Sequence, residues 1–351
     1  MNRGTDGLSF PWDSAPAEGA ATEVAEGLLW MRLPLPMALD HVNVYALDDG
    51  DGWTLVDTGL SSGRGIALWD RLLAGPLSGR PVRRVIVTHH HPDHVGLAGW
   101  FAGRGARILT SRTSYLMARM LTLDVQETWP AETLAFYRAA GMDAEVFAAR
   151  RADRPFNFAD SVSPLPLGYH RLTEGARVTA GGRRWRVAMG GGHAPEHVTL
   201  WSEDGALVLG GDQLLPGISP NLGVYPTEPE ADPVADWLEA CRKLSHLATE
   251  AQLVLPGHKR PFRGLPLRLA QLIENHVSAL DRLAAHLATP RSAGQCFLPL
   301  FRREIRGDEY GLALVEAYAH CLHLWHHGRA RRWQEDGVDL FEAPPREGAT
   351  G

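Results

Sequence analysis

The chain has 351 residues, of which 44% are hydrophobic and 22% charged, and its formal net charge at pH 7 is -6. These values are ordinary for a globular protein with a large core. The mildly acidic balance offers no basic surface for nucleic acid or for an anionic membrane. The three cysteines are widely spaced and form no C-x-x-C pair, which argues against a disulfide framework or a thiolate zinc site.

The two ends of the chain carry few structural signals. The first residues lack the positively charged and apolar regions of a signal peptide. No apolar run approaches the roughly eighteen residues that a membrane-spanning helix needs. We therefore expect a cytoplasmic protein with no membrane partner. Gly, Ala, Pro and acidic residues predict a loose N-terminal segment at 1–25 and a tail at 346–351.

Strands and helices alternate in the next part of the chain. Three strand-like runs lie between residues 27 and 57, and the turn-forming DDGDG separates the second from the third. Helical apolar spacing covers 63–75, and a strand of the buried type follows at 82–88. A helix is expected to begin near Val95, and another strand covers 106–111.

Residues 112–170 change to helical periodicity, with breaks at Pro130 and Gly141. Met and aromatic residues are frequent there. We interpret the segment as a packed helical cap, part of whose inner face lines an apolar pocket. Strands resume in two predicted hairpins, at 176–190 and 197–212.

The last third of the chain begins with a predicted helix at 232–248 and a strand at 252–257. From 265 onward the pattern is helical again, and two short strands follow around Asp336 and Gly337. Helices followed by a hairpin predict a small winged-helix-like α+β module at 264–345.

The segment HHHPDH, residues 89–94, follows an apolar strand and carries four histidines and an aspartate. Histidine is the commonest metal ligand near neutral pH. A loop of this kind directs imidazoles and a carboxylate into one cavity, and these N and O ligands suit Zn²⁺, with Fe or Mn as alternatives. The competing interpretation is a polar loop that happens to be rich in histidine.

Three later strands each stop at a glycine that is followed by one metal-ligand side chain. GGGHAPEH supplies His193, LVLGGD supplies Asp212 and LVLPGH supplies His258. Any one of these alone is more often structural. Because all three follow HHHPDH in this order, a chance occurrence of four such segments is a poor explanation.

In this order the motifs H-x-H-x-D-H, G-H-x-P-x-H, G-D and G-H resemble those of the metallo-β-lactamase superfamily. The resemblance implies an α/β fold, an αββα two-sheet sandwich with two metal ions at one edge. We accordingly expect a catalytic domain at 26–263 with the 112–170 cap inserted in it. LVDTG at 55–59 matches the family's first motif, whose aspartate, here Asp57, supports the metal loop.

The resemblance also implies the metal ligands. They are His89, His91 and His193 for one ion and Asp93, His94 and His258 for the other, with Asp212 bridging both. The form of the first motif, compared with that of the diiron relatives, favours two Zn²⁺ ions and hydrolysis over redox iron.

Two divalent cations roughly 3.5–4 Å apart can share a hydroxide that is a nucleophile near pH 7. Neutral imidazoles cannot offset two dications, which accounts for the carboxylates of Asp93 and Asp212. We expect Asp212 to bridge and Asp93 to take part in proton handling. Asp57 and His197 are expected to support the ligands from behind. The alternatives are a turn-capping Asp57 and a purely structural His197.

Other histidines receive a structural interpretation. His90 is expected to point away from the ligands, and His41 lies on an early strand that reaches the edge of the site at most. Glu196 stands where many relatives have Gly. The C-terminal histidines are expected to form a partly exposed helix face and no further metal site; they are His320, His323, His326 and His327.

The resemblance implies a metallohydrolase, and the family acts on thioesters, lactones, β-lactams and phosphodiesters. The apolar cap favours a small thioester, lactone or ester with an apolar acyl part, in the manner of hydroxyacylglutathione hydrolases. One alternative is a nuclease, because some relatives with a C-terminal winged helix act on RNA. Residues 289–351 carry eight Lys or Arg against nine Asp or Glu, which argues against it. The other is a non-catalytic metal-binding protein, which the complete ligand set disfavours.

The sequence also predicts substrate contacts and partners. The Pro- and Gly-rich loop at 214–229, which contains Tyr225, is expected to form a wall of the site. Lys259, next to the last ligand, is expected to meet a substrate carboxylate, with surface exposure as the alternative. The expected partner is a small-molecule substrate and no nucleic acid. We expect the C-terminal module to pack on the catalytic domain or on a second subunit of a homodimer.

Overall fold

The computed structural model describes residues 7–344. The chain forms two compact units, which we call the sandwich unit and the helical unit. The sandwich unit comprises Met1–Val125, Phe156–Pro220 and Lys243–Leu269, and the helical unit comprises Gln126–Pro155, Asn221–Arg242 and Ala270–Gly351. Part of the predicted cap therefore belongs to the helical unit. The predicted tail at 346–351 lies outside the described residues.

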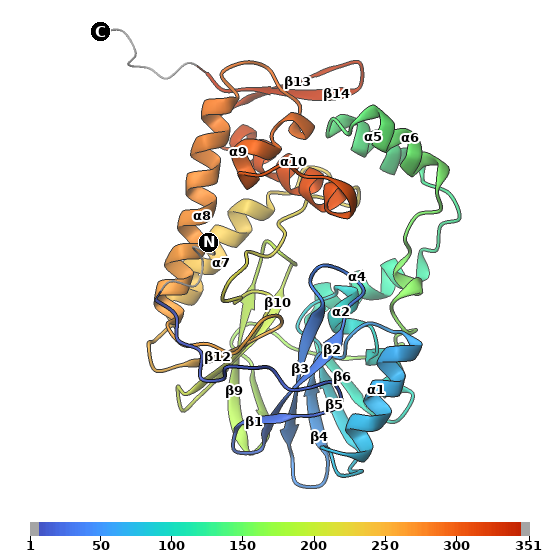
Figure 1. The fold of residues 1–351 in the computed structure, drawn as a ribbon, viewed down its shortest axis with the longest axis vertical. Helices are drawn as coiled ribbons and strands as arrows, with labels where there is room; N and C mark the ends of the chain where they lie inside the picture. The colour runs from blue at the N-terminus through green and yellow to red at the C-terminus, as the bar shows by residue number, and fades with distance from the viewer. Residues whose placement is uncertain (1–6, 345–351) are drawn as a thin grey trace. The chain divides into compact units, whose positions relative to one another are not determined.

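Seven strands form the first sheet of the sandwich unit, in the order of the sequence (Figure 1). They are β1 (Thr22–Ala25), β2 (Leu28–Pro34), β3 (His41–Asp48), β4 (Trp53–Val56), β5 (Val82–Ile86), β6 (Arg107–Thr110) and β7 (His170–Arg171). The pairs from β1 to β4 are antiparallel, and those from β4 to β7 are parallel. The carboxyl ends of β5 and β6 therefore lie at the same edge of the sheet.

Five strands form the second sheet, in the order β12-β11-β10-β9-β8. They are β8 (Arg177–Ala180), β9 (Arg183–Gly190), β10 (His197–Ser202), β11 (Leu207–Gly211) and β12 (Leu253–Pro256). Gly181 and Gly182 join β8 to β9 with φ values of 59° and 66°, which a two-residue hairpin turn of the primed type requires. Both predicted hairpins are present in this sheet.

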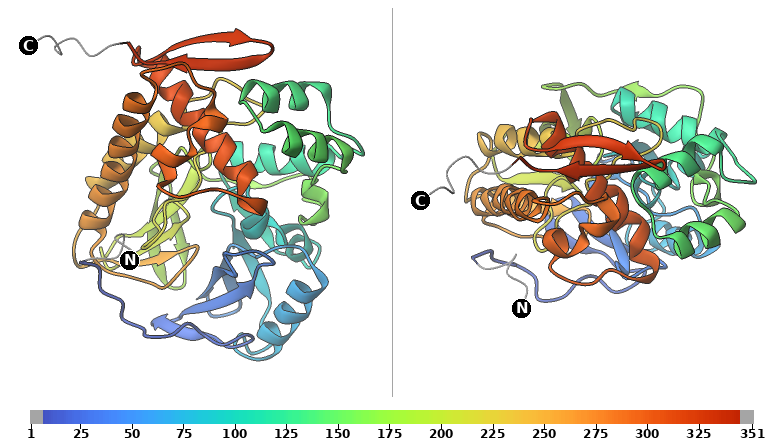
Figure 2. Two further views of the ribbon diagram at one scale, coloured as in Figure 1. Left: turned by 45° about the horizontal axis from the view of Figure 1, so that its top comes forward. Right: turned by 90° about the horizontal axis from the view of Figure 1, so that it is seen from above.

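The two sheets pack face to face, the first drawn in blue to cyan and the second in yellow-green (Figures 1 and 2). One core contains side chains from both: Trp30 and Ile86 come from the first sheet, and Trp185, Val198 and Leu255 from the second. All five are fully buried. Apolar burial between two inner faces is what stabilises a β-sandwich. The predicted α/β two-sheet sandwich is confirmed.

Helices cover the outer face of the first sheet. They are α1 (Gly63–Ala74), α2 (Pro92–Val95), α3 (Ala98–Ala102) and α4 (Arg112–Leu123). Trp69 of α1 and Phe101 of α3 share a second core with the strand residues Val44 and Val85. The Ser62 side chain caps α1 by accepting the Gly65 N–H.

The N-terminal segment is better held than its composition indicates. Strand β1 pairs with β2, and Ser9 pairs with Arg263 through backbone hydrogen bonds. The guanidinium of Arg260 also donates to the carbonyl of Trp12. The prediction of a loose segment at 1–25 is therefore wrong for residues 9–25, because the carbonyls of this stretch find partners far along the chain.

The helical unit consists mainly of helices. They are α5 (Ala131–Ala139), α6 (Ala144–Ala152), α9 (Phe297–Phe301) and α10 (Tyr310–His326), followed by the hairpin of β13 (Arg331–Glu335) and β14 (Val338–Glu342). Helices α7 (Pro233–Ser245) and α8 (Leu265–His286) contribute residues to both units. Short 3-10 turns lie at Phe158–Asp160, Ala293–Gln295 and Gly307–Glu309. The expected order of helices and a final hairpin is present, and the winged-helix resemblance stays a prediction.

Helix α10 is buried on most of its circumference. His320 is 2% exposed and His323 7%, so the expectation of a partly exposed histidine face holds for His326 and the following His327 but not for these two. The reason is that α10 packs against other elements of its unit on more than one side. None of the helices within residues 7–344 combines the length and apolarity needed to cross a membrane.

Candidate metal centre

The HHHPDH segment leads from the end of β5 into helix α2 at the edge of the first sheet. Pro92 is the first residue of α2, where a missing N–H is tolerated, so the chain turns directly after His91. His89 and His94 are fully buried, whereas the Asp93 side chain remains 20% exposed. The segment therefore presents two enclosed imidazoles and one carboxylate that solvent can reach.

The second sheet supplies three further side chains from the ends of its strands. His193 follows β9, Asp212 follows β11 and His258 follows β12. Strands β11 and β12 are parallel, so Asp212 and His258 leave the sheet at the same edge. Gly257 lets them come together, because a Cβ atom there would lie 2.2 Å from Asp212 Oδ1. Gly257 thus makes room for the neighbouring ligand-type side chain.

Three imidazoles meet at one end of the site. His91 Nδ1 lies 3.0 Å from His89 Nε2 and 3.0 Å from His193 Nε2. A neutral imidazole nitrogen carries at most one proton, so His91 Nδ1 cannot donate to both neighbours at once. Three nitrogens directed at one point are suited to a cation that accepts their lone pairs. This donor set fits a divalent metal ion.

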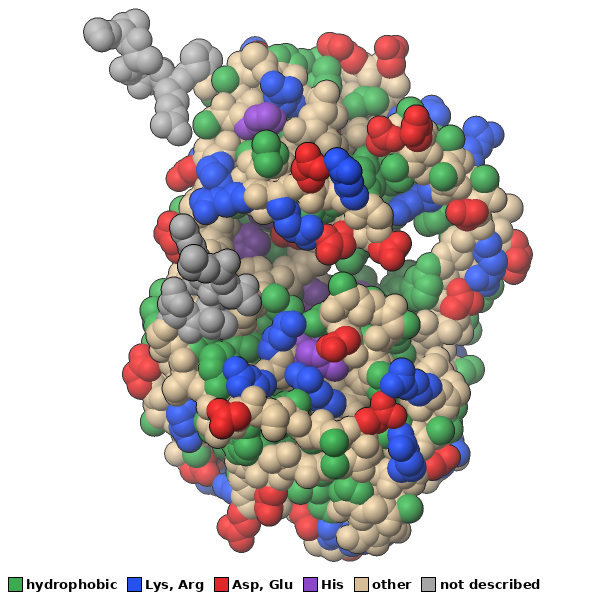
Figure 3. Space-filling model, in the orientation of Figure 1, with side chains coloured by type: hydrophobic (Ala, Val, Ile, Leu, Met, Phe, Trp, Pro, Cys, Tyr) green, Lys and Arg blue, Asp and Glu red, His purple; other side chains and the backbone are tan. Residues whose placement is uncertain are grey.

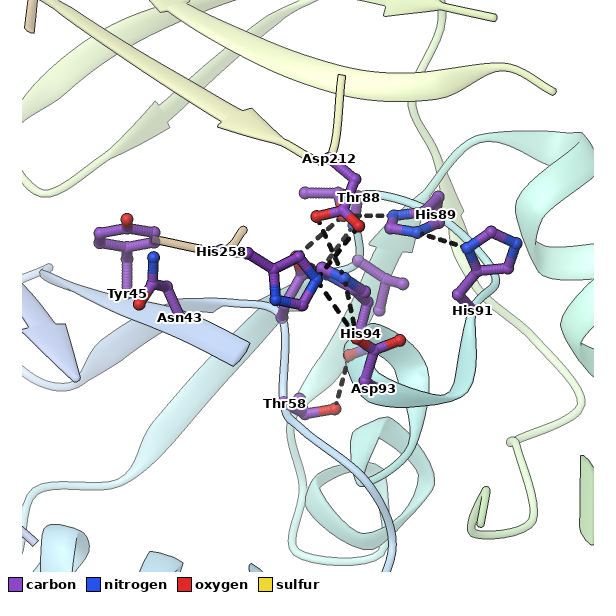
Figure 4. Close-up of polar contacts among 12 residues, drawn as sticks. Asn43, Tyr45, Thr58, Thr88, His89, His91, Asp93, His94, Asp212 and His258 are labelled. Carbon is purple, nitrogen blue, oxygen red and sulfur yellow. Dashed lines mark hydrogen bonds and ion pairs between the residues drawn. The ribbon is translucent and has the colours of Figure 1, made fainter. Parts of the chain in front are cut away.

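Carboxylates and imidazoles meet at the other end (Figure 4). His258 Nε2 lies 3.4 Å from Asp93 Oδ2 and 3.2 Å from Asp212 Oδ2. Asp212 also lies 3.4 Å from His94 Nε2 and 3.5 Å from His193 Nε2, so its carboxylate faces both ends. Asp212 Oδ1 and His94 Nε2 are buried and make no hydrogen bond within residues 7–344. The two atoms face each other at 3.4 Å without making a hydrogen bond, which is costly for buried polar groups, and a bound cation would satisfy both.

Asp57 holds the histidine loop from behind. Its carboxylate accepts the Thr88 N–H and the Thr88 hydroxyl, each at 2.8 Å, and lies 2.8 Å from His94 Nδ1. His94 Nδ1–H is thereby committed to Asp57, and Nε2 is left free to face Asp93 and Asp212. A carboxylate behind a ligating histidine sets its tautomer and orientation. Asp57 itself adopts a φ of 62°, which accompanies the sharp exit from β4.

His197 and His41 play comparable supporting roles. His197 Nε2 accepts the Asp212 N–H at 3.1 Å, and its ring stacks on His89 at a centroid distance of 4.6 Å. The backbone carbonyl of His41 accepts from His258 Nδ1 at 2.7 Å, which leaves His258 Nε2 to face the carboxylates. His41 thus acts through its main chain. Its own Nε2 accepts the N–H of Lys259 at 2.9 Å.

Two residues that the sequence did not single out fix the strand end before His258. Asn43 Nδ2 donates to the carbonyls of Pro256 and Lys259, each at 2.8 Å, and the Tyr45 hydroxyl donates to Pro256 O at 2.8 Å. The Asn43 side chain in turn accepts from Trp30 Nε1. The signal for Asn43 is a polar side chain in the otherwise apolar strand HVNVYAL, where a buried amide needs partners.

The protonation states divide the site. Burial, followed by the neighbouring imidazoles, lowers the pKa of His89 and of His91 well below the ordinary value. For His258 burial also acts to lower the pKa, but Asp212 and Asp93 outweigh it and raise the pKa to about 10. The pKa of His94 is raised in the same way, with Asp212 as the largest favourable charge. The end with His89 and His91 therefore offers the lone pairs of neutral imidazoles. At the other end, the carboxylates of Asp93 and Asp212 stabilise the protonated imidazoles of His94 and His258.

The remaining predicted residues are placed as follows. His90 is buried, and its ring lies parallel to Phe158 at 6.3 Å, outside the groups able to hold a metal. Glu196 has a φ of 47°, and its carboxylate accepts the N–H of Thr113 at the start of α4. Lys259 follows His258 with a φ of 68°. Tyr225 belongs to the helical unit, and its contact with substrate stays a prediction.

Comparison with known proteins agrees with this architecture. Residues 37–285 match the family model of the metallo-beta-lactamase superfamily, and residues 280–344 match that of the metallo-beta-lactamase-like C-terminal domain. The probable metallo-hydrolase YqjP of Bacillus subtilis (strain 168) is 29% identical over 242 residues, which are 68% of this chain and 73% of YqjP.

Two crystal structures resemble nearly the whole chain. A beta-lactamase domain protein from Burkholderia ambifaria is 36% identical with a TM-score of 0.87, over 98% of this chain and 99% of the other. A metallo-beta-lactamase family protein from Thermus thermophilus is 27% identical with a TM-score of 0.77, over 92% of this chain and 100% of the other. With its fold, its His and Asp groups able to bind a metal, and these relatives, the chain belongs to the metallo-beta-lactamase superfamily and is a metallohydrolase.

Proposed function

We propose that this metallohydrolase binds two Zn²⁺ ions through His89, His91, Asp93, His94, His193, Asp212 and His258 and hydrolyses a small thioester, lactone or ester with an apolar acyl part. The observation that carries the proposal is the position of Asp212, whose carboxylate faces His193 at one end of the site and His94 and His258 at the other. Imidazole and carboxylate ligands suit zinc, and iron or manganese are the alternatives.

Two bound divalent ions would supply Lewis acidity, which lowers the pKa of water towards neutrality and polarises an acyl oxygen. The residues of the chain orient this chemistry. Asp57 and the His41 carbonyl hold His94 and His258 in the tautomers that leave Nε2 facing the site. Asp93, the more exposed of the two carboxylates, is proposed to hold the proton that leaves the attacking water.

The apolar acyl part is inferred from helix α4. Leu116, Met120 and Leu123 are 54%, 45% and 68% exposed and lie three or four residues apart, so they form one apolar stripe. Helix α4 begins directly after β6, at the sheet edge where β5 delivers the histidine loop. Glu196, between His193 and His197, binds the N–H of Thr113 and so ties the start of α4 to the metal loops. We propose that this stripe contacts the acyl chain.

A nuclease or other phosphodiesterase of the same fold is the alternative. The basic side chains of the C-terminal hairpin are already paired: Arg332 with Asp339, Arg331 with Glu342, and Arg329 with Asp281. On the face drawn in Figure 3, Asp and Glu side chains are scattered among the Lys and Arg side chains, a few of which lie side by side near the centre of the view. Neutralised cations make a poor phosphate-binding surface. We therefore favour a small substrate, with Lys259 and Tyr225 as proposed contacts. Cytoplasmic location and a homodimer stay predictions.

The test is a substrate panel assayed with zinc-loaded protein: acyl thioesters, lactones, aryl esters, a β-lactam and bis-p-nitrophenyl phosphate. We expect turnover of a carboxylic thioester, lactone or ester, and its loss in Asp212→Ala. Asp70→Ala, at an exposed position on α1, is the matched control and should keep full activity. Turnover of the phosphodiester alone, abolished in Asp212→Ala, would establish the alternative. Metal analysis that finds iron in place of zinc would overturn the cofactor assignment.

A further inference from the structure

Three metal-ligand side chains also meet in the helical unit, and two of them, His323 and His327, belong to the C-terminal histidines for which the sequence predicted no metal site. Asp232 Oδ1 lies 2.9 Å from His323 Nδ1, and Asp232 Oδ2 lies 3.1 Å from His327 Nε2. The donor atoms of all three side chains lie within 4.8 Å of one another. Two imidazoles and a carboxylate from separate parts of the chain therefore converge on one point.

Rigid elements hold these side chains. His323 and His327 are four residues apart at the end of α10, so they project from the same side of the helix. Asp232 directly precedes α7 and is fixed by the N–H of Ala235, which donates to Oδ1 at 3.0 Å. The convergence thus follows from a helix end and a helix start, and no long flexible loop has to be ordered.

Access is open on one side. The side chain of His327 is 52% exposed and that of Asp232 19%, while that of His323 is 9% exposed. An ion can therefore reach the three donors from solvent and retain water in its remaining coordination positions. A site with three protein ligands and an open position is a known arrangement for zinc and related cations.

The charge around Asp232 favours a cation. Burial, and then the nearby carboxylates of Asp232, Glu239 and Glu228, raise the pKa of Asp236 in the first turn of α7. Burial is the larger cause, and the acidic neighbours add a repulsion that a positive charge would reduce. A divalent ion beside Asp232 would relieve this repulsion.

A second histidine group in the same unit serves as a comparison. His320 Nδ1 donates to the carbonyl of Glu316 at 2.8 Å, which leaves His320 Nε2 to accept from His276 Nδ1 at 3.2 Å. Both histidines are at least 96% buried, since His276 is 4% and His320 2% exposed. The contact between the two rings uses one proton, and both imidazoles are closed off from solvent. The Glu316 carboxylate completes a group of metal-type donors there, and His276 Nε2 is buried without a hydrogen bond within residues 7–344, so this group differs from the Asp232 group in access rather than in donor type.

We propose that Asp232, His323 and His327 form a further metal site that takes a divalent transition cation such as Zn²⁺, with water completing the coordination. In the metal-free protein both imidazoles donate an N–H to Asp232. When the cation binds at these nitrogens, each neutral ring carries its proton on its other nitrogen, and a protonated ring releases one proton to solvent. The bound ion joins the start of α7 to the end of α10. The site is independent of the substrate chemistry proposed above.

The experiment counts zinc bound per chain, by isothermal titration and by elemental analysis after dialysis. We expect His327→Gln and Asp232→Asn each to lose one equivalent relative to the unsubstituted protein. Asn keeps the capping oxygen for Ala235, so Asp232→Asn removes the charge without removing the helix cap. His326→Gln changes the adjacent exposed histidine, whose Nε2 faces the carbonyl of Glu230, and should lose none.

A second readout is thermal unfolding with and without added Zn²⁺. The zinc-dependent rise in Tm should be smaller in His327→Gln than in His326→Gln, because a ligand that binds the folded state alone stabilises it. Circular dichroism confirms that each variant is folded. Equal zinc stoichiometry in all of the variants would overturn the proposal, and the three side chains would then be a hydrogen-bonded group that binds no metal.

Discussion

The two units each bring histidines together, but they leave them in different chemical states. In the sandwich unit, His91 Nδ1 faces two other imidazole nitrogens that it cannot both satisfy by donating a proton. In the helical unit, one proton satisfies the two nitrogens that His276 and His320 turn towards each other, and His320 donates its own proton to the backbone of Glu316, while His276 Nε2 makes no hydrogen bond within residues 7–344. Counting protons against facing nitrogens therefore separates a metal centre from a buried hydrogen-bonded pair, even where residue types and distances are alike.

The largest expected effect is at the carboxylate that faces both ends of the metal centre. Asp212→Ala should lower kcat/KM by more than about 100-fold, because the loss of a ligand exceeds the 10–100-fold cost of losing a supporting partner. Zinc content per chain, measured with the kinetics, should fall as well. Near-normal turnover by Asp212→Ala would show that the two ends of the candidate metal centre do not act together. The contrast between this centre and the histidine pair of the helical unit would then fail.

Asp57→Asn tests the support behind the histidine loop. An amide cannot accept from Thr88 and His94 as a carboxylate does, so His94 should lose its fixed tautomer. We expect a loss of about 10–100-fold in metal affinity or activity, with the fold retained. Zinc competition with a chelator measures the affinity. If affinity and activity were unchanged, Asp57 would be a turn residue and no partner of the metal loop.

Gly257→Ala tests whether the close approach in the sandwich unit is required. The new Cβ would lie 2.2 Å from Asp212 Oδ1 and 2.9 Å from His94 Cε1. Overpacking of this kind costs about 1–3 kcal/mol, which urea unfolding would detect. Gly63→Ala, where a Cβ meets nothing within 4 Å, is the control. Equal stability of the two variants would mean that the strand end can move without cost.

The smallest effect concerns the histidine pair of the helical unit. Burial lowers the pKa of His276 to about 3 and that of His320 to about 4. A histidine with a lowered pKa in the folded state contributes full stability above its unfolded value, and this contribution is lost as the pH falls through the window between the two values. We therefore expect the free energy of unfolding to decrease from about pH 6.5 towards pH 4.

Two substitutions distinguish the contribution of this pair to the pH dependence of stability from that of other groups. His276→Leu should reduce the acid dependence of the urea midpoint, while His246→Leu, at an exposed position on the sandwich unit, should leave it unchanged. An identical pH dependence in both variants would show that other groups carry the acid sensitivity.

Local patterns explain why much of this architecture was predictable. The strands, the turns at DDGDG and Gly181-Gly182, and the HHHPDH segment are contiguous in the chain, and each carries its own signal. The positions of His193, Asp212 and His258 at strand ends were equally readable. Strands of one sheet can end at the same edge, so a metal-ligand residue at the end of each strand predicts that these side chains lie close together.

What the sequence could not predict depends on partners far apart in the chain. Asn43 binds the carbonyls of Pro256 and Lys259, and no local pattern indicates that pairing. Asp232 meets His323 for the same reason, since one precedes a helix and the other ends another. The burial of His320 was also missed, because helix α10 is apolar on several sides and histidine spacing alone does not reveal which of them is covered.

The distribution of the proposed metal ligands over both sheets has a consequence for the stability of the sandwich. Asp93 and His94 belong to the first sheet's edge, whereas Asp212 and His258 belong to the second's. An ion held by donors from both sheets closes a long chain segment into a loop, and its binding free energy becomes part of the free energy that holds the sheets together. Release of the ion and separation of the two sheets are then coupled events. Removal of the metal by a strong chelator should therefore lower the free energy of unfolding, as urea denaturation with and without the chelator would measure.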